Sequence, residues 1–586
     1  ALRLCCTGMF ATCAPNALVG DVIYTTVICQ SDVIRDENGN IAAVSYHNNP
    51  AWEQGNHRFH TLLVHGERGP AFPDQFCFSY PEFVGDGTLE HPENLARLSC
   101  RHTRKGPGFF AVSALLFVRA GQTVTADNFT GLCSEAVTPD YSEEAFHSQV
   151  AALIDRFSDP AQGENALRQT ADFAGRYAAF LSVSDPDRDF ESYVNQNLPY
   201  QVFYQTFASR AFDQTQKGYR EIGFREIQDI FASMYYFCSM GRADFVKQLL
   251  REWISNVYEM GYANHDFYWA GKRPGVCSDD QLWLPQALDR YVKLTGDYEF
   301  LLEDCPMAGG GSRRIFDTVK AIIEYSGKIS VGQHGLPLID KADWNDTLNV
   351  DPNWVDGPEK ERLYKEQLKQ GGSWGDPFVS DQSESVMNGF LLKLAMDIAA
   401  DMAGRLGDAA YQQEVRGLAE ALAGRLQKHG YKNGMFARVL LNRPYSYTPY
   451  LGAAGDGLSV EGDEGTCFLN SFSWAILSGV AKEEQIRSML EVLGRQLRTP
   501  YGFRLCTGVD YAKIAPQVGA ALYYRGDREN GGVFKHANMM ACAAMLQAAS
   551  RVEDKDLAAE LCRTAWWVID VALPYKTLAH PFDTCG

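Results

Sequence analysis

The spacing of hydrophobic residues changes at about residue 140. Before that point, short runs rich in β-branched residues, at 22–28 and 111–118, are separated by clusters of Gly, Pro, Asn and Asp. Such runs predict β-strands, and several of them joined by turns indicate a sandwich. We therefore expect residues 1–140 to form a β-sandwich, or the C-terminal part of one. The histidines here are expected to fill surface or core positions rather than to bind a metal: His57, His60 and His65.

Beyond that point, apolar residues recur at intervals of three and four, which predicts amphipathic helices. Two such segments, 142–157 and 164–180, give a helical linker over residues 141–187. Further helices are expected to begin near residues 188, 226, 241, 280, 312, 382, 408, 466, 482, 536 and 554. No short repeat period relates them, so a solenoid is not expected. A closed ring of helix pairs fits residues 188–586 better.

One stretch of this helical part has neither a helical nor a strand period. Residues 341–349 read KADWNDTLN, and the polar stretch after them, which contains Pro and Gly, is expected to be a loop as well. An indole offers a flat apolar face to a pyranose, and Asp and Asn make paired hydrogen bonds to hydroxyls. A carboxyl beside an indole can be desolvated, which raises its pKa and favours a proton near neutral pH. Two alternatives are capping of a following helix by Asp343 or Asp346 and, less favoured, a calcium loop.

Two other segments place charges at predicted helix starts. Residues 218–229 hold two Arg and three acids around a Gly, either as an exposed ion-pair network or as partly buried charges around a ligand. Residues 277–283 hold Asp279 and Asp280. Capping of the helix by Ser278 or Asp279 is the simpler explanation, and a second carboxylate at the same site is the functional one.

Residues 529–538 place a Gly pair before a predicted helix N-terminus, followed by Lys535 and His536. The free N–H groups and the positive dipole of a helix start, together with cationic side chains, outline an anion or phosphate site. The sequence contains no serine nucleophile elbow, HExxH motif, Rossmann fingerprint or P-loop.

The composition is that of a folded soluble protein. The chain has 586 residues, of which 46% are hydrophobic and 22% charged, and its length predicts two to four domains. A net charge of -19 without any basic block argues against nucleic acid and membrane as partners. The 15 cysteines are scattered in apolar contexts without a CxxC pair, which favours free thiols in a reducing compartment, so a cytoplasmic location is predicted. Because the chain starts without Met and stops without a closing element, we expect a piece of a longer protein.

Taken together, the segments resemble the inverting glycoside phosphorylases of the cellobiose and chitobiose phosphorylase family (glycoside hydrolase family 94). The matching segments follow the family's order: 220–229, 278–285, 342–349, 461–474 and 529–536. The resemblance implies a mainly α protein with a β domain, made of an N-terminal β-sandwich, a helical linker and an (α/α)6 barrel catalytic domain. The family places a further phosphate loop beyond the last residue of this chain.

The resemblance also implies roles for single residues. Asp346 is expected to be the general acid and His536 to bind phosphate. The residues expected to bind sugar are Arg220, Glu226, Asp279, Asp280, Trp344, Asn345, Glu529 and Lys535. Glu226 stands where disaccharide phosphorylases usually have Asp. Phosphate is a co-substrate, and neither a metal nor a cofactor is expected.

Three segments, 219–226, 332–338 and 383–388, look most like β-1,2-oligoglucan phosphorylases. The resemblance therefore implies reversible phosphorolysis, with inversion, of a β-linked glucan to α-glucose 1-phosphate and a shortened oligosaccharide. The expected partners are the β-glucan oligosaccharide and phosphate or glucose 1-phosphate, and a homodimer is compatible with them. The alternatives are a cellobiose- or laminaribiose-type phosphorylase, an inverting hydrolase, and a non-catalytic glycan-binding module of a cyclic glucan synthase.

Overall fold

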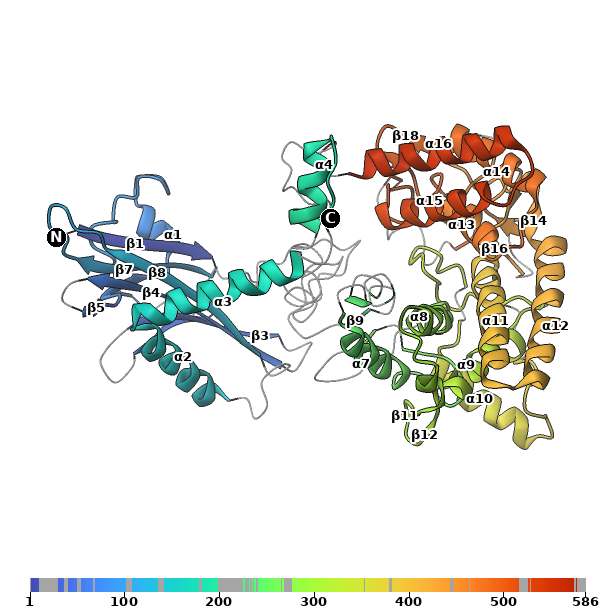
Figure 1. The fold of residues 1–586 in the computed structure, drawn as a ribbon, viewed down its shortest axis with the longest axis horizontal. Coiled ribbons are helices and arrows are strands. Elements are labelled where there is room, and N and C mark those ends of the chain that lie inside the picture. Colours follow the sequence, from blue (N-terminus) through green and yellow to red (C-terminus); the bar gives the residue numbers. More distant parts are fainter. Residues whose placement is uncertain are drawn as a thin grey trace. The chain divides into compact units, whose positions relative to one another are not determined.

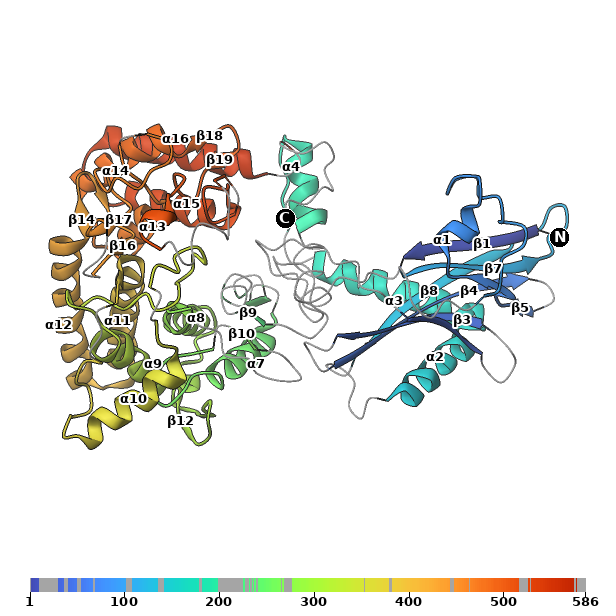
Figure 2. The same cartoon turned by 180° about the vertical axis from the view of Figure 1, so that it is seen from behind.

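The computed structural model forms two compact units (Figure 1, and from behind in Figure 2). One consists of Ala1–Ser184, Val194–Arg225 and Tyr268–Lys272, and the other of Asp185–Tyr193, Glu226–Phe267 and Arg273–Gly586. The residues that the structure describes are 2–9, 30–35, 41–49, 54–66, 69–101, 108–134, 142–178, 182–198, 225–226, 231, 234, 237–238, 241–264, 266–267, 277–351, 354–378, 382–442, 447–462, 464–515, 525–526, 528–573 and 576.

The strands of the first unit form two antiparallel sheets. One has the order β1-β7-β6, and in the other β2, β3, β4 and β5 are neighbours while β8 also pairs with β4. Their bounds are β1 (Leu2–Met9), β2 (Gln30–Arg35), β3 (Ile41–Asn49), β4 (Gln54–Gly66), β5 (Gly69–Ala71), β6 (Gln75–Cys77), β7 (Phe109–Leu116) and β8 (Thr125–Ser134). The strand predicted at 111–118 is confirmed by β7, whereas the one predicted at 22–28 lies outside the described residues.

Strand β4 contributes to two cores because successive side chains of a strand point to opposite faces. Leu62 and Val64 pack with apolar residues of β6 and β7. On the same face, the buried ring of His60 stacks on Phe110, with 4.4 Å between the ring centroids. On the other face, Phe59 packs against helix α2 (Glu143–Phe157), which α3 (Pro160–Ala178) follows. Burial lowers the pKa of His60 to about 4, so this histidine is a neutral core residue, as expected.

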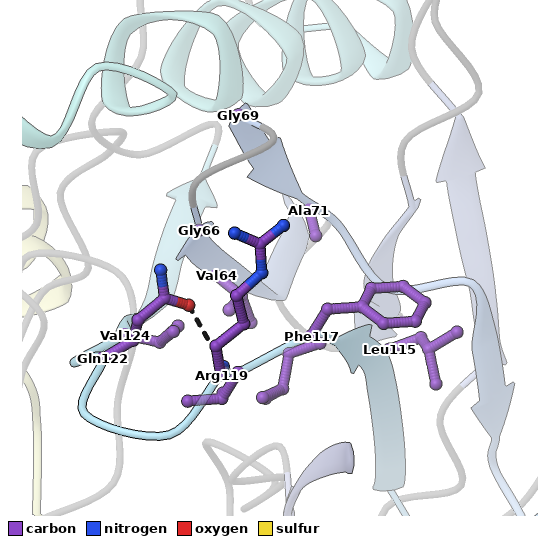
Figure 3. Close-up of a pocket in the computed structure, with 11 residues that line it drawn as sticks. Val64, Gly66, Gly69, Ala71, Leu115, Phe117, Arg119, Gln122 and Val124 are labelled. Carbon is purple, nitrogen blue, oxygen red and sulfur yellow. Dashed lines mark hydrogen bonds between the residues drawn. The ribbon is translucent and has the colours of Figure 1, made fainter. Parts of the chain in front are cut away.

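The first unit also contains an open pocket of about 210 Å³ (Figure 3). Residues of β4, β5 and β7 line it, mostly with aliphatic side chains. The turn beside it is closed by the backbone N–H of Arg119, which donates to Oε1 of Gln122 at 3.0 Å. None of the site residues predicted from the sequence lines this pocket.

Helices dominate the second unit. Their bounds are α4 (Arg188–Ser192), α7 (Ala243–Ile254), α8 (Asp280–Thr295), α9 (Ile315–Glu324), α10 (Gly357–Lys369), α11 (Val386–Leu406), α12 (Ala409–Arg425), α13 (Leu469–Leu477), α14 (Glu483–Gln496), α15 (Lys535–Ala549) and α16 (Lys555–Ala572). Helix α11 packs against α8, α12 and α13, and α15 packs against α13 and α16. The protein is therefore mainly α with small sheets. Among the described residues, no helix combines the length and the apolar content that crossing a bilayer requires.

Short antiparallel strands connect these helices. Their bounds are β9 (Arg225–Glu226), β10 (Asp266–Phe267), β11 (Asp304–Pro306), β12 (Ser312–Arg314), β13 (Glu384–Ser385), β14 (Tyr431–Lys432), β15 (Met435–Phe436), β16 (Val439–Leu440), β17 (Tyr450–Leu451), β18 (Arg498–Thr499) and β19 (Gly502–Phe503). Most predicted helix starts lie within a few residues of the observed ones. Near 226 the helix starts later than predicted: Glu226 lies in β9, and the next described residues, 231, 234, 237 and 238, are helical.

The prediction of a loop after residue 349 is wrong over Gly357–Lys369, which form α10. The side chain of Asp356 caps this helix by accepting from the N–H of Glu359 at 2.9 Å, and Pro lies in its first turn. Only Lys360 and Tyr364 are buried, and exposed Arg–Glu pairs cover its outer face. Because its buried residues are a lysine and a tyrosine, and Leu368 is only partly buried, the apolar period of the helix is weak.

The loops that precede four of the helices are joined to one another. Asn388 in the first turn of α11 donates from Nδ2 to Oγ of Ser278, just before α8, at 2.8 Å. Phe468, at the start of α13, pairs with Cys506, whose Sγ donates to the backbone O of Glu529 at 3.4 Å. Glu529 in turn belongs to the loop that leads into α15. Helix N-termini, with their free N–H groups and positive dipole ends, therefore gather around these loops.

Candidate functional site

A buried ion pair fixes the centre of the loop at 340–349. Oδ1 and Oδ2 of Asp343 accept from Nη2 and Nη1 of Arg438, each at 2.5 Å, and both side chains are 0% exposed. Oγ of Ser385, the N-cap of α11, donates to Oδ2 at 2.6 Å, and the backbone N–H of Asn345 donates to Oδ1 at 3.1 Å. Asp343 is thus a structural carboxylate.

This geometry removes both alternative explanations of the loop. No helix begins directly after Asp343 or Asp346, since the next one is α10. The carboxylate of Asp343, which would be the first ligand of a calcium loop, is instead paired with the guanidinium of Arg438. Within the described ranges, no three His, Cys, Asp or Glu side chains come together so as to hold a metal ion.

A second buried ion pair lies at the start of the loop. Asp340 has a positive φ of 52°, which is unfavourable for a residue with a side chain. Its Oδ1 accepts from Nζ of Lys360 at 2.6 Å, and that fully buried ammonium also donates to Oγ of Ser330 at 2.8 Å. Burial raises the pKa of Asp340, and the ammonium of Lys360 opposes that rise. Each of the two buried charges thus has the other as its counter-ion.

The side chain of Asn345 connects two loops. Its Oδ1 accepts from the backbone N–H of Thr347 at 3.0 Å and from Oγ1 of Thr347 at 2.5 Å. Its Nδ2 donates to the backbone O of Glu529 at 3.4 Å. Oγ1 of Thr347 and the hydroxyl of the buried Tyr511 lie 2.7 Å apart. The amide predicted to bind sugar is therefore already bonded within the protein.

Trp344 lies beside the start of α15. Its indole is half-buried, and its centroid is 5.8 Å from the ring of Phe534 and 5.9 Å from the imidazole of His536, both in edge-on arrangements. The structure thus brings together the loop at 340–349 and the loop at 529–536, two of the segments singled out from the sequence. Asp346, two residues after Trp344, is half-buried between two buried neighbours.

The loop before α15 takes a tight course. Glu529 is 6% exposed, and its Oε1 lies 3.3 Å from Nη2 of Arg528. Gly531 has a φ of 104°, and a Cβ on Gly532 would lie 2.6 Å from the backbone O of Arg528. A side chain would be strained at the first position and would clash at the second, so the Gly pair is needed for this turn.

The side chains of Lys535 and His536 at the start of α15 have different surroundings. His536 is half-buried next to Trp344. Lys535 donates from Nζ to the backbone O of Ala572 at 2.8 Å, and Ala572 is the last residue of α16. The ammonium of Lys535 therefore caps a helix C-terminus.

Asp279 and Asp280 are buried at the start of α8. Asp279 makes no side-chain capping bond, and its Oδ2 instead accepts from Nε1 of Trp283 at 2.8 Å. Asp279 thus occupies the N-cap position of α8, but its side chain does not cap the helix. Ser278, just before it, is bonded to the loop at 340–349 through the backbone O of Ala342.

Two predicted sugar ligands could not be placed. Arg220 lies outside the described residues, and only the backbone of Glu226 is described, in β9. Conversely, Arg438 was not anticipated from the sequence, although it pairs with Asp343. The available signal was a single charged residue inside the otherwise apolar run at 435–441, since a buried charge requires a partner.

The profile of the glycosyl hydrolase 94 superfamily catalytic domain matches residues 176–551, which is more than half of the chain. The chain belongs to the glycosyl hydrolase 94 superfamily. A cellobionic acid phosphorylase of Neurospora crassa is 24% identical over 476 residues, covering 80% of this chain and 53% of the relative. An N,N'-diacetylchitobiose phosphorylase of Vibrio furnissii is 25% identical over 422 residues, covering 66% and 47%. A cyclic beta-(1,2)-glucan synthase of Rhizobium meliloti is 26% identical over 420 residues, covering 66% and 13%.

The chain thus spans about half the length of the two phosphorylases that it matches. The superfamily match begins near the end of α3 and ends just after α15, so it includes the loops described above and excludes the two sheets of the first unit.

Proposed function

We propose that this chain is the catalytic part of an inverting glycoside phosphorylase, built on an (α/α)6 barrel, which transfers a glucosyl unit from a β-linked oligosaccharide to phosphate. The observation that carries the proposal is the contact of Trp344 with His536. It puts a flat apolar face for a sugar next to an imidazole at a helix start, where an anion is stabilised. Two matched relatives of the superfamily are themselves phosphorylases.

In the proposed reaction, Asp346 donates its proton to the glycosidic oxygen as the bond from that oxygen to C1 breaks and positive charge develops on the sugar ring. A phosphate oxygen forms the new bond to C1 from the opposite face, so a β-linked glucoside gives α-glucose 1-phosphate. Phosphate is already an anion and therefore needs positioning rather than a general base. His536 and the N–H groups at the start of α15 supply that positioning.

The sugar site is proposed around this centre, with Trp344 as the stacking surface. The side chains proposed to bind hydroxyls are Asp279, Asp280 and Glu529. The same role for Arg220, Glu226, Asn345 and Lys535 stays a prediction. For Asp279, Asn345 and Lys535, binding a hydroxyl would require their present hydrogen bonds to be exchanged for bonds to sugar.

We propose a β-1,2-oligoglucan as the substrate. Two of the segments that resemble β-1,2-oligoglucan phosphorylases are in contact, because Oε2 of the buried Glu384 lies 2.6 Å from Nδ1 of His334. The similarity to a cyclic beta-(1,2)-glucan synthase supports the same linkage. Cellobiose- and laminaribiose-type activities are the alternatives within this reaction class.

The test is a panel of sophoro-oligosaccharides, cellobiose and laminaribiose, incubated with the protein with and without phosphate. We expect glucose 1-phosphate only with phosphate, and the highest rate with the β-1,2-linked substrates. Release of reducing sugar without phosphate would identify a hydrolase instead. Binding of sugar without any turnover would identify a glycan-binding module.

A further inference from the structure

We propose that Arg438 is a positioning residue for this reaction, which fixes the loop that carries Trp344 and Asp346 without touching the substrate itself. The inference rests on the proposed function. It assigns a role to a residue that lies outside every segment noted for its resemblance. It also predicts a loss of rate that a residue which only stabilises the fold would not cause.

The backbone of Arg438 is held on both sides. Its N–H donates to the O of Leu451 in β17 at 2.7 Å, and its O accepts from the N–H of Val386, the first residue of α11, at 3.2 Å. Arg438 therefore lies directly before β16, the central strand of the β13-β16-β17 sheet, with backbone hydrogen bonds to both sides. An element of this kind can hold a side chain in one place.

The guanidinium acts on one partner. Among the described residues, its hydrogen bonds go to Asp343 alone, as two parallel N–H···O bonds of 2.5 Å. Two parallel bonds fix the plane of the carboxylate as well as its position, which a single ammonium could not do. Because both side chains are 0% exposed, no bulk water competes for these bonds.

Asp343 transmits this position to the reactive part of the loop. Its Oδ1 accepts from the backbone N–H of Asn345, which is bonded covalently to Asp346. Asn345 in turn reaches the backbone O of Glu529. A displacement of Asp343 would therefore move the proposed acid and the link to the loop before α15 together. A displacement of about 1 Å in such a site can cost on the order of 10²-fold in rate.

Stability and positioning can be separated in this pair. Removing Arg438 alone leaves an unpaired buried carboxylate, which destabilises the fold. Replacing both charges by apolar residues removes that penalty and often restores stability. The double replacement does not restore the acceptor that holds the N–H of Asn345. We therefore expect the double variant to fold stably while the loop is no longer fixed.

The experiment compares Arg438→Met, Asp343→Leu/Arg438→Met and Arg438→Lys with the parent and with the control Arg416→Met, an exposed residue of α12. We measure the free energy of unfolding, kcat with a sophoro-oligosaccharide and phosphate, and kcat with β-glucosyl fluoride, whose leaving group needs little protonation. In the double variant we expect stability near that of the parent, a kcat for the oligosaccharide lower by on the order of 10²-fold, and a much smaller loss for the fluoride. Arg438→Lys, with one contact instead of two, should give an intermediate kcat.

Hydrogen exchange of the peptide 341–349 gives a second readout that does not need activity. We expect the amide of Asn345 to exchange faster in the double variant and in Arg438→Lys than in the parent. If stability and the oligosaccharide rate return together in the double variant, Arg438 has only a structural role and the inference is wrong. If the parent itself makes no glucose 1-phosphate, the proposed function fails. In that case, unchanged exchange of Asn345 in Arg438→Lys and in the double variant would overturn the inference as well.

Discussion

The indole of Trp344 and the imidazole of His536 lie edge-on with 5.9 Å between their centroids, although they belong to loops far apart in the sequence. One residue is a sugar-stacking surface of the proposed site and the other is its proposed anion ligand. Their contact means that a glucosyl unit on the indole would have its reacting carbon close to an anion held at the start of α15. This juxtaposition is what a transfer of glucosyl to phosphate requires.

Replacing Trp344 by Ala should lower kcat/KM roughly 30-fold, which corresponds to a loss of about 2 kcal/mol of transition-state stabilisation, because a large stacking surface is lost. Trp374→Ala is the matched control, since Trp374 is 51% exposed and packs against Tyr364 of α10. Steady-state phosphorolysis by both variants checks this. Equal losses in the two variants would contradict the assignment of Trp344 to the sugar site.

The substitution Asp346→Asn should lower kcat for an oligosaccharide by on the order of 10²–10⁴-fold, because the general acid is lost. With β-glucosyl fluoride the loss should be much smaller, since fluoride leaves with little protonation. The rates with both substrates test this role of Asp346, and circular dichroism checks that the variant is folded. A variant as active as the parent on the oligosaccharide would show that Asp346 is not the acid.

The neutral His60 in the first unit should make stability depend on pH. Its pKa is about 4 in the folded protein, against an ordinary value of 6.5. As the pH falls below 6.5, the unfolded chain gains a proton that the folded protein cannot accept until about pH 4. Stability is therefore lost through this window, by about 2 kcal/mol between pH 7 and pH 5.

The variant His60→Leu should lack this part of the loss, whereas the exposed control His91→Leu should keep it. Urea titrations of the full chain at pH 7 and pH 5, read out by proteolysis of the first unit, measure the difference. An equal pH dependence in the parent and in His60→Leu would mean that His60 takes up a proton in the folded protein.

Lys360→Met should reduce the free energy of unfolding by roughly 3–5 kcal/mol, because Asp340 would be left as an unpaired buried carboxylate. Arg362→Met in the same helix removes an exposed ion pair and should cost less than about 1 kcal/mol. Denaturant unfolding of both variants checks the contrast. If Asp340→Asn/Lys360→Met is no more stable than Lys360→Met alone, the unpaired carboxylate is not the source of the loss.

Much of the fold could be predicted because most helices of the second unit bury an apolar stripe. Helices such as α7 and α14 have that stripe at intervals of three and four, and strand β7 is apolar except for Ser113. Helix α10 could not be predicted in this way, since the residues that it buries are Lys360 and Tyr364. Its signals were the capping Asp356 and the Pro in its first turn, which are weaker than a periodic pattern.

The site was predictable in part. Trp344 and His536 stood out because loops rich in aromatic and charged residues are poor core elements. The pairing of Asp343 with Arg438 could not be read from the sequence, since a bond between distant segments depends on the tertiary fold. The capping role of Lys535 at Ala572 escaped for the same reason. In each case the charged residue can be seen in the sequence, but its partner is decided by how distant segments pack in the folded protein.

The central claim is transfer to phosphate with inversion at C1, and it can be tested by following the first minutes of the reaction of a sophoro-oligosaccharide with phosphate by ¹H and ³¹P NMR. The account predicts that α-glucose 1-phosphate is the first product and that it forms in step with the shortened oligosaccharide. Formation of β-glucose 1-phosphate, or of free glucose at the same rate without phosphate, would contradict it.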